Sequence, residues 1–228
     1  MTPRKKFDTS CLPDHPDLSF EDELWAKGLR FVAGVDEAGR GALAGPVAAG
    51  AVVLPCDLSD LSNKLDGVND SKVMTPEDRE EKAAVIKEIA LGWGVGFAAS
   101  REIDRFGILP ATYLAAERAL AMLELGFEHI LLDYIILPGI DIPQTPLIKG
   151  DARSLTIAAA SILAKTERDA LMVKMDDEFP GYYFAANKGY GTKSHRQAIE
   201  RFGPCEQHRK TFSPLKEYFS LFPPEMTE

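Results

Sequence analysis

Two adjacent carboxylates, Asp36 and Glu37, stand between an apolar segment and a glycine-rich turn. Residues 32–35 form a short run rich in valine, typical of a strand that enters a buried sheet, so both carboxylates should lie where that strand ends. Neighbouring anionic groups repel one another and lose hydration on burial, so each needs a lysine, a helix N-terminus or a water-filled loop beside it. One divalent metal ion would satisfy both, which makes them candidate metal ligands.

The turn that follows, residues 39–41, carries a single arginine, Arg40. Together with Ala44, its two glycines match the G-x-G-x-x-A spacing of a dinucleotide-binding turn. That motif requires a helix directly after the turn, but Gly45-Pro46 intervenes and residues 47–54 are again strand-like. The pattern favours a hairpin whose rim presents the two carboxylates and the arginine. Carboxylates for a metal and an arginine for phosphate indicate phosphodiester chemistry.

Two further carboxylates, Asp133 and Asp151, follow strand-like segments at residues 130–132 and 147–148. In open α/β sheets, ligands bind at the carboxyl ends of parallel strands. A single aspartate after a strand is often a cap or turn residue, and Asp151 does precede the helix expected at 154–177. Asp133 has no helix directly after it to cap. Four carboxylates that converge from three strand ends are hard to explain by capping and favour a metal site.

The other segments alternate between helical and strand patterns. Helices are expected at residues 19–28, from Pro76 to about 91, and at 110–125, and a third strand is expected at 94–100. Three antiparallel strands followed by strand and helix alternation predict an α/β protein with a mixed five-stranded sheet flanked by helices.

The C-terminal part has a different pattern. Phe179-Pro180-Gly181 ends the long helix, and a glycine-flanked loop, a short helix from Ser194 and a proline-containing segment follow. We expect a helical lobe that closes over the site. The expected division is a flexible N-terminal tail, a catalytic domain that includes this lobe, and a C-terminal tail, at residues 1–18, 19–216 (lobe at about 180–216) and 217–228.

The net charge of −9 counts against a generic nucleic-acid binder. Residues 187–216, however, contain seven lysines and arginines and two acidic residues, a local net charge of +5. Such a run is as often a solvated helix face, but the interleaved aromatic residues and glycines favour a substrate surface. The two histidines of this segment, His195 and His208, have basic neighbours, so we expect them at the surface or on phosphate.

Other features bear on the compartment. No apolar run approaches ~18 residues, so no membrane span is expected. The first residues are charged and contain prolines, unlike a secretory signal. Three widely spaced cysteines, Cys11, Cys56 and Cys205, form no C-x-x-C pair, which argues against a disulfide framework and a zinc site. We expect a cytoplasmic protein.

Six motifs in a fixed order carry a resemblance to a known family. The chain resembles ribonuclease HII over roughly residues 25 to 216 through GVDEAGRGALAGP at 34–46, VNDSK at 68–72, LLDY at 131–134, KGDARSLTIAAASILAK at 149–165, KGYGT at 188–192 and HRKTFSP at 208–214. The resemblance implies a ribonuclease H-like fold, and it implies that two Mg²⁺ or Mn²⁺ ions are held by Asp36, Glu37, Asp133 and Asp151.

The resemblance also implies how substrate is recognised. The backbone of Gly39 and Gly41 would approach the 2′-hydroxyl, Arg40 would hold the adjacent phosphate, and Tyr190 would stack on the sugar at an RNA–DNA junction. Further contacts with the nucleic acid are implied for Lys72, Ser161, Lys165 and Lys188. The implied enzyme is a monomeric endoribonuclease. It would hydrolyse the RNA strand of RNA–DNA hybrids and cut 5′ of ribonucleotides embedded in DNA, leaving 3′-hydroxyl and 5′-phosphate ends. Its implied roles are ribonucleotide removal in DNA repair and RNA primer removal in replication.

Three positions depart from the family pattern. Asn187 replaces a histidine, and Tyr134 and Tyr183 stand where glycine is usual. The related type HIII would carry an N-terminal nucleic-acid-binding domain, for which about thirty residues before the first strand leave no room. Two alternatives remain. One is a nucleic-acid-binding module without turnover, which metal-dependent cleavage of a hybrid would exclude. The other is a nucleotide-binding oxidoreductase, which the absence of NAD(P) binding would exclude.

Overall fold

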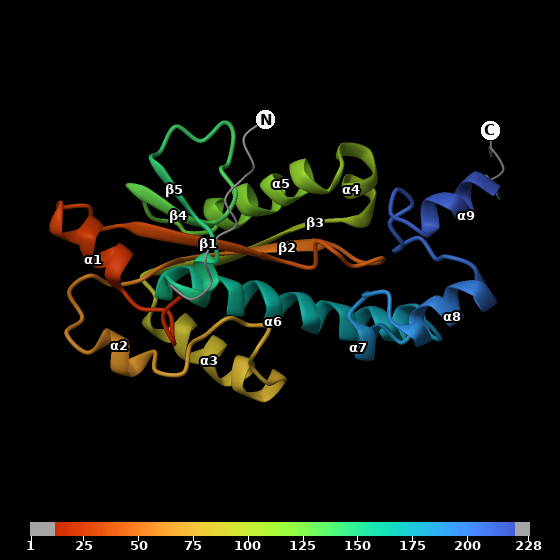
Figure 1. Ribbon diagram of the computed structural model, residues 1–228, viewed down its shortest axis with the longest axis horizontal. Coiled ribbons are helices and arrows are strands. Elements are labelled where there is room, and N and C mark those ends of the chain that lie inside the picture. The colour runs from red at the N-terminus through yellow and green to blue at the C-terminus, as the bar shows by residue number, and fades with distance from the viewer. Residues whose placement is uncertain (1–11, 222–228) are drawn as a thin grey trace.

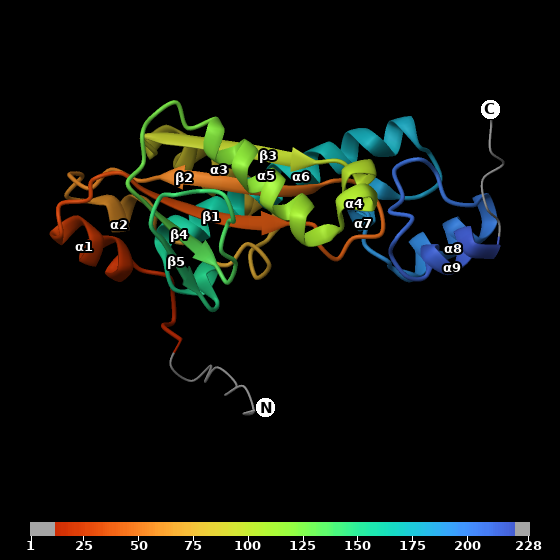
Figure 2. The same cartoon turned by 90° about the horizontal axis from the view of Figure 1, so that it is seen from above.

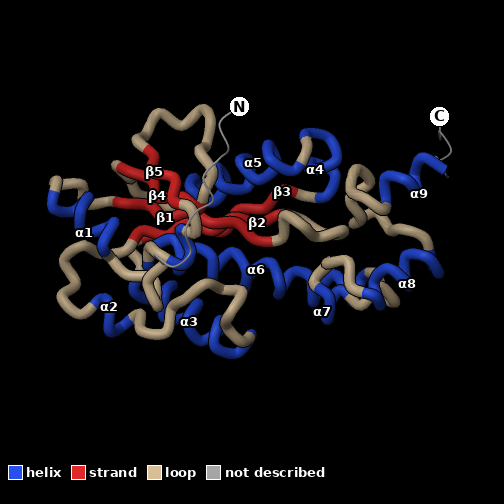
Figure 3. Tube along the Cα trace, viewed as in Figure 1, coloured by secondary structure: helices blue, strands red, loops and turns tan. Residues whose placement is uncertain are grey.

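Five strands form one mixed sheet through the middle of the protein (Figures 1 and 3). The computed structural model describes residues 12–221. The strands are β1 (Val32–Ala38), β2 (Val47–Val53), β3 (Gly92–Ala98), β4 (His129–Asp133) and β5 (Gln144–Leu147), in the order β3-β2-β1-β4-β5. The first three pair antiparallel, and β4 pairs parallel with both β1 and β5. The predicted fold class is confirmed.

Helices cover both faces of this sheet. They are α1 (Ser19–Ala26), α2 (Leu61–Lys64), α3 (Pro76–Ile89), α4 (Ser100–Phe106), α5 (Ile108–Ala121), α6 (Leu155–Glu178), α7 (Phe184–Asn187), α8 (Lys193–Phe202) and α9 (Leu215–Leu221), with a 3₁₀ turn at Gly150–Ala152. Figures 1 and 2 show α4 and α5 on one face and α3 and α6 on the other. No helix in this described part of the chain is long and apolar enough to cross a membrane.

The region between β3 and α5 differs from the sequence-based prediction. The third strand ends at Ala98, and α4 occupies residues that were expected to be strand or loop. Gly107, with φ of 87°, separates α4 from α5, which therefore begins at Ile108 and not at Pro110. Pro110 lies in the first turn of α5, where a helix needs no N–H donor.

Helix α6 lies very close to the sheet because glycines face it. A Cβ atom at Gly50 would lie 2.2 Å from the carbonyl oxygen of Ala160, and one at Gly34 would lie 2.5 Å from the carbonyl carbon of Thr156. The small residues at the start of α6 allow the same approach from the helix side. This close packing fixes the helix against β1 and β2, beside the strand that carries Asp36.

The C-terminal helices α7, α8 and α9 lie at the end of the molecule opposite α1 (Figures 1 and 2). They share an apolar cluster with the turn between β1 and β2, to which Leu43, Met172 and Phe184 contribute. Helix α9 continues to Leu221, beyond residue 216, where the C-terminal tail was expected to begin. The predicted tail residues 1–11 and 222–228 lie outside the described residues.

Candidate active site

The four predicted carboxylates come from three neighbouring elements at one edge of the sheet. Asp36 and Glu37 lie in β1, Asp133 ends β4, and Asp151 lies in the 3₁₀ turn before α6. Because β1 and β4 are parallel neighbours, with Val35 opposite Leu132, their ends meet. Asp36 is 4% exposed and Asp151 is 1% exposed. The fold thus brings these acids together, with Asp36 and Asp151 buried and Glu37 and Asp133 partly buried.

Burial and repulsion from neighbouring carboxylates disfavour the charged forms of Asp36 and Asp133. Burial raises the pKa of Asp36 well above its usual value, and the charges of Glu37, Asp133 and Asp151 raise it further. Burial likewise raises the pKa of Asp133 to about 6, although the hydrogen bond of 2.7 Å from the Gly150 N–H acts to lower it. An added positive charge would favour the charged forms of both Asp36 and Asp133.

Lys72 supplies one such charge. Its Nζ lies 2.8 Å from Oδ2 of Asp151 and 3.6 Å from Oδ1 of Asp70. Burial alone would lower the pKa of Lys72, but the hydrogen bond to Asp151 and the charges of Asp36 and Asp151 raise it above its usual value. The side chain is still 64% exposed. Lys72 was predicted to contact phosphate, and the structure places its ammonium on a carboxylate instead.

The carboxylate group has unused ligand atoms. Among the described residues, Oδ2 of Asp36 and Oδ1 of Asp151 are buried and accept no hydrogen bond. Oxygen ligands of this type suit Mg²⁺ and Mn²⁺. In residues 12–221, no three acidic, histidine or cysteine side chains are already gathered at ligating distance, so Glu37, now 3.0 Å from the Arg40 guanidinium, must turn to join them. The residues present fit divalent ions once the side chains adjust.

A cavity of 520 Å³ opens beside the carboxylates. Its walls include most of the predicted site: Asp36, Glu37, Gly39, Arg40, Gly41, Lys72, Asp133, Lys165 and Tyr190. Asp151, Ser161 and Lys188 are not among its lining residues. Ser161 is buried, and its hydroxyl lies 2.8 Å from that of Ser71. Its predicted contact with nucleic acid stays a prediction, as does that of Lys188.

The two glycines of the turn, Gly39 and Gly41, differ in how far the fold requires glycine at their positions. Gly39 has φ of 88°, and a Cβ atom there would lie 1.9 Å from Nε of Arg168. Gly41 is exposed, its φ lies outside the left-handed region, and no atom lies within 4 Å of the position of an added Cβ. Gly39 is therefore required by the fold, whereas Gly41 leaves open space at the cavity.

Tyr190 also lines the cavity and lies in the loop before α8. Lys165 Nζ is 5.6 Å from its ring centroid, and the Arg168 guanidinium is 5.5 Å from it. The backbone oxygen of Tyr190 accepts a hydrogen bond of 2.9 Å from Nδ1 of His195. The ring is thus half-buried, with cations beside it, and reaches the cavity from a loop far along the chain.

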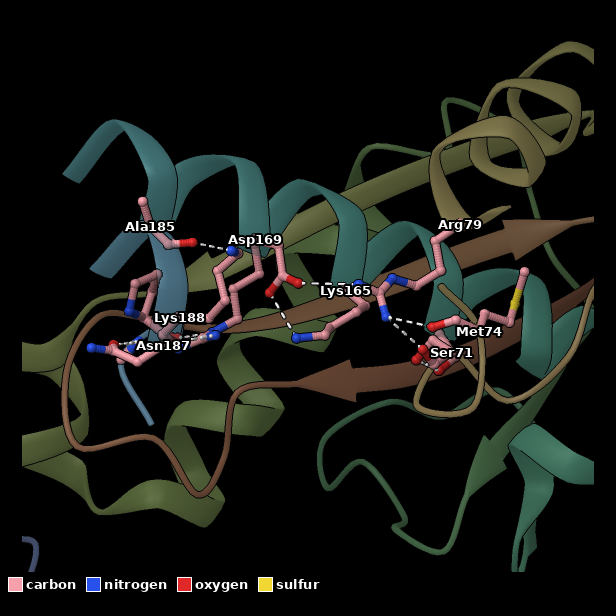
Figure 4. A network of polar contacts seen from close by, with 12 residues as sticks. Ser71, Met74, Arg79, Lys165, Asp169, Ala185, Asn187 and Lys188 are labelled. Atoms are coloured by element: carbon pink, nitrogen blue, oxygen red, sulfur yellow. Dashed lines mark hydrogen bonds and ion pairs between the residues drawn. The ribbon is translucent and has the colours of Figure 1, made fainter. Parts of the chain in front are cut away.

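An ionic network that the sequence did not reveal supports one wall of the cavity (Figure 4). Arg79 donates to the backbone oxygen of Ser71 at 2.8 Å and lies 3.5 Å from Oδ2 of Asp169. Oδ1 of Asp169 lies 2.7 Å from Nζ of Lys165. The network joins the loop of Ser71 and Lys72 to α6. The i, i+4 spacing of Lys165 and Asp169 was the one signal in the sequence.

The sequence-based prediction that both histidines lie at the surface or on phosphate is wrong. His195 and His208 are both fully buried, with their Nε2 atoms 3.1 Å apart. The backbone N–H of Cys205 donates to Nδ1 of His208 at 2.9 Å, so the ring proton of His208 is on Nε2 and is donated to His195. His195 then carries its own proton on Nδ1, facing the oxygen of Tyr190. The histidines form a neutral chain that ends at the Tyr190 loop.

The three departures from the family pattern have simple structural explanations. Asn187 is buried, donates to the backbone oxygen of Tyr182 at 2.7 Å and accepts from the Gly189 N–H at 2.8 Å, so one side chain holds both sides of the loop. Tyr134 and Tyr183 have φ of 65° and 60°. Glycine adopts this left-handed conformation without strain, which accounts for glycine as the usual residue there.

Comparisons with known proteins agree with one another. The family model described as Ribonuclease HII matches residues 33–214. The ribonuclease HII of Moorella thermoacetica is 52% identical over 194 residues, 85% of this chain and 92% of that protein. That of Synechococcus sp. (strain JA-3-3Ab) is 50% identical over 202 residues, 89% of this chain and 90% of that protein.

Solved structures share the fold. Ribonuclease H2 from Pyrococcus horikoshii OT3 aligns with a TM-score of 0.71 at 24% identity over 84% of this chain and 98% of that one. Bst-RNase HIII, solved in complex with Mn²⁺, aligns with a TM-score of 0.63 at 19% identity over 84% of this chain and 70% of that one. The chain belongs to the ribonuclease HII family. It is a divalent-metal-dependent ribonuclease H endonuclease that acts on RNA–DNA substrates.

Proposed function

We propose that this ribonuclease HII cuts a duplex on the 5′ side of a ribonucleotide, using two Mg²⁺ or Mn²⁺ ions held by Asp36, Glu37, Asp133 and Asp151. The products would carry a 3′-hydroxyl and a 5′-phosphate. The observation that carries this proposal is the pair of buried carboxylate oxygens, on Asp36 and Asp151, that have no partner among the described residues. They lie in a group of acids that repel one another.

The bound ions would supply an activated water molecule and stabilise the negative charge of the departing 3′-oxygen. The carboxylates of the chain hold and orient them. Gly150 helps because its N–H fixes Oδ1 of Asp133 at 2.7 Å and leaves Oδ2 free to bind. No side chain has to act as nucleophile.

Lys72 would exchange one partner for another during this process. In the structure its ammonium neutralises Asp151 at 2.8 Å. Ions on the carboxylates would repel it, and its exposed stem would let the ammonium move toward a phosphate of the substrate. Arg40, whose guanidinium lies 3.0 Å from Glu37, would move to phosphate in the same way. The predicted phosphate contacts of both residues are then compatible with their present partners.

Selectivity for ribonucleotides would come from the turn and from Tyr190. Gly41 leaves room for close approach of the sugar, and Tyr190, which also lines the cavity, would stack on it. Lys165 is held by Asp169 beside that ring and would contribute a phosphate contact, and Ser161 would place Ser71 nearby through their hydrogen bond. Lys188 would add positive charge to the same loop.

The remaining parts of the proposal concern the protein as a whole. We infer that residues 19–216 act as one catalytic domain with the C-terminal lobe included, that the enzyme works as a monomer, and that it works in the cytoplasm. Its roles would be removal of embedded ribonucleotides and of RNA primers. An RNase HII from Archaeoglobus fulgidus was solved in complex with PCNA, so sedimentation should be measured with and without a sliding clamp.

The test is a DNA duplex with one embedded ribonucleotide, incubated with and without Mg²⁺, with the termini of the products identified. We expect one cut, only with metal, directly 5′ of the ribonucleotide. A 2′,3′-cyclic phosphate would show that the 2′-hydroxyl is the nucleophile and would refute the proposal. Binding without any cut would favour the alternative, a binding module of the same fold.

A further inference from the structure

Two arginines lie fully buried behind the glycine-rich turn. Arg168 comes from α6 and Arg209 from the segment after α8, and both are 0% exposed. Within the described chain neither forms an ion pair with a carboxylate, and their hydrogen bonds go to backbone oxygens. A buried guanidinium is costly unless its donors are satisfied, so such a pair needs a structural or functional reason.

Arg209 binds the turn itself. Its Nη2 donates to the oxygen of Gly39 at 2.8 Å, its Nη1 donates to the oxygen of Arg40 at 2.8 Å, and its Nε donates to the oxygen of Gly45 at 3.0 Å. The backbone N–H of Arg209 donates to the oxygen of Leu43 at 2.8 Å, which fixes the arginine beside the turn. The planar fork of a guanidinium can meet several carbonyls in a fixed geometry, and a lysine cannot reproduce it.

This arrangement determines where the amides of the turn point. In a planar trans peptide the C=O of one residue and the N–H of the next point in opposite directions. Because the oxygens of Gly39 and Arg40 face the buried guanidinium, the N–H groups of Arg40 and Gly41 face away from it. These N–H groups have no hydrogen-bond partner among the described residues, and both residues line the cavity. The turn therefore presents two free donors to the substrate.

Arg168 extends the same support to the Tyr190 loop. It donates to the oxygen of Pro46 at 2.9 Å and to the oxygen of Lys188 at 3.0 Å, and its guanidinium lies 5.5 Å from the ring centroid of Tyr190. Arg168 thus adds a side-chain link between these segments to the backbone hydrogen bonds that the Leu43 and Ala44 N–H groups donate to the oxygen of Gly189.

We propose that Arg209, together with Arg168, is a positioning residue that sets selectivity for ribonucleotides by holding the amide donors of residues 40 and 41 toward the 2′-hydroxyl. The inference rests on the proposed function of this turn. It assigns the arginines no contact with substrate. Their charges also make the potential behind the turn more positive, which favours a phosphate in the cavity.

The test measures binding selectivity apart from turnover. Fluorescence anisotropy with Ca²⁺ in place of Mg²⁺ gives the Kd of a duplex with one ribonucleotide and of the same duplex made wholly of DNA. Arg209→Lys is compared with wild type and with Arg201→Lys, a matched control at an exposed arginine of α8. We expect Arg209→Lys to reduce the ratio of the all-DNA Kd to the ribonucleotide Kd by about tenfold, because misplaced amides lose hydrogen bonds to the 2′-hydroxyl. Arg201→Lys should leave the ratio unchanged.

Other readouts separate this role from a general loss of structure. The affinity for Mn²⁺, followed by electron paramagnetic resonance, should not change in Arg209→Lys. An unchanged ratio, or an equal loss of affinity for both duplexes, would overturn the inference. If Arg209→Lys is unfolded at the assay temperature, Arg168→Lys is measured instead, and an unchanged ratio there would overturn it too. A wild-type protein that binds both duplexes equally would instead refute the proposed function of the turn.

Discussion

Acid should loosen the C-terminal lobe through the buried histidine pair, and His208→Gln should remove that sensitivity. His208 accepts from the Cys205 N–H and donates to His195. The unprotonated nitrogen of each ring therefore already faces an N–H donor, which opposes the binding of a second proton. Burial, together with the neighbouring His195, lowers the pKa of His208 to about 4. Glutamine cannot be protonated and keeps an N–H at a similar position.

The magnitude follows from the two pKa values. An unfolded histidine titrates near 6.5, so between pH 6.5 and 4 the unfolded state binds a proton that the folded state excludes. The contribution of His208 to stability is therefore complete above pH 6.5 and is lost as the pH falls toward 4. The expected loss is about 2 kcal/mol at pH 5 and about 3 kcal/mol at pH 4.

The assay is urea unfolding at pH 7.5 and at pH 5 for wild type, His208→Gln and His15→Gln, an exposed histidine that serves as control. His208→Gln should start from lower stability, since it loses a ring packed 5.0 Å from that of Tyr182, but should lose about 2 kcal/mol less than wild type on acidification. Cleavage should fall with stability in wild type because His195 holds the Tyr190 loop. Equal pH dependence in wild type and His208→Gln would refute the neutral-pair assignment.

Three further predictions concern the cavity. Gly39→Ala should lower the free energy of unfolding by more than about 1 kcal/mol, because residue 39 has a positive φ and an added Cβ would overlap Arg168. Gly41→Ala should have the stability of wild type within about 0.5 kcal/mol but should cleave poorly. Equal denaturation midpoints for the two variants would contradict this. Lys72→Met should lower the thermal midpoint more in EDTA than in Mg²⁺, because Asp151 loses its counter-charge only when no metal replaces it. Tyr190→Ala should lose more activity on a single embedded ribonucleotide than on a long hybrid. Tyr190→Phe should lose less activity than Tyr190→Ala, since the hydroxyl adds at most about 0.5–1.5 kcal/mol. An unchanged ratio of the two rates would show that the tyrosine serves only in packing.

The sheet and the carboxylates could be predicted because their signals are local. A short apolar run followed by Asp36-Glu37 indicates a buried strand that ends in acids, and Asp133 repeats the pattern. The parallel pairing of β1 and β4 then brings them together. Helix α4 was missed because the strand expected at residues 94–100 includes its first residue, Ser100, and its N-cap position is Ala99, which gives no capping signal.

The buried polar groups could not be predicted in the same way. Arg209 and His208 lie in a basic segment whose composition is that of a solvated surface. They are buried because residues 207–209 run beside residues 43–45, a contact between segments far apart in the chain. The ion pair of Lys72 also depends on such a contact, because its partner Asp151 lies 79 positions later. Sequence patterns report exposure along one element, whereas these positions depend on which elements meet.

The most direct test of the central claim is the cleavage rate of Asp133→Asn on a duplex with one embedded ribonucleotide, across a titration with Mg²⁺. Asparagine keeps the oxygen that accepts from the Gly150 N–H and removes one buried charge, so the variant should fold at least as stably as wild type. With a metal ligand lost, transition-state stabilisation should fall by several kcal/mol, and the rate by about a thousandfold even at saturating Mg²⁺. Turnover near that of wild type at saturating Mg²⁺ would contradict the assignment of the four carboxylates as the metal-holding site.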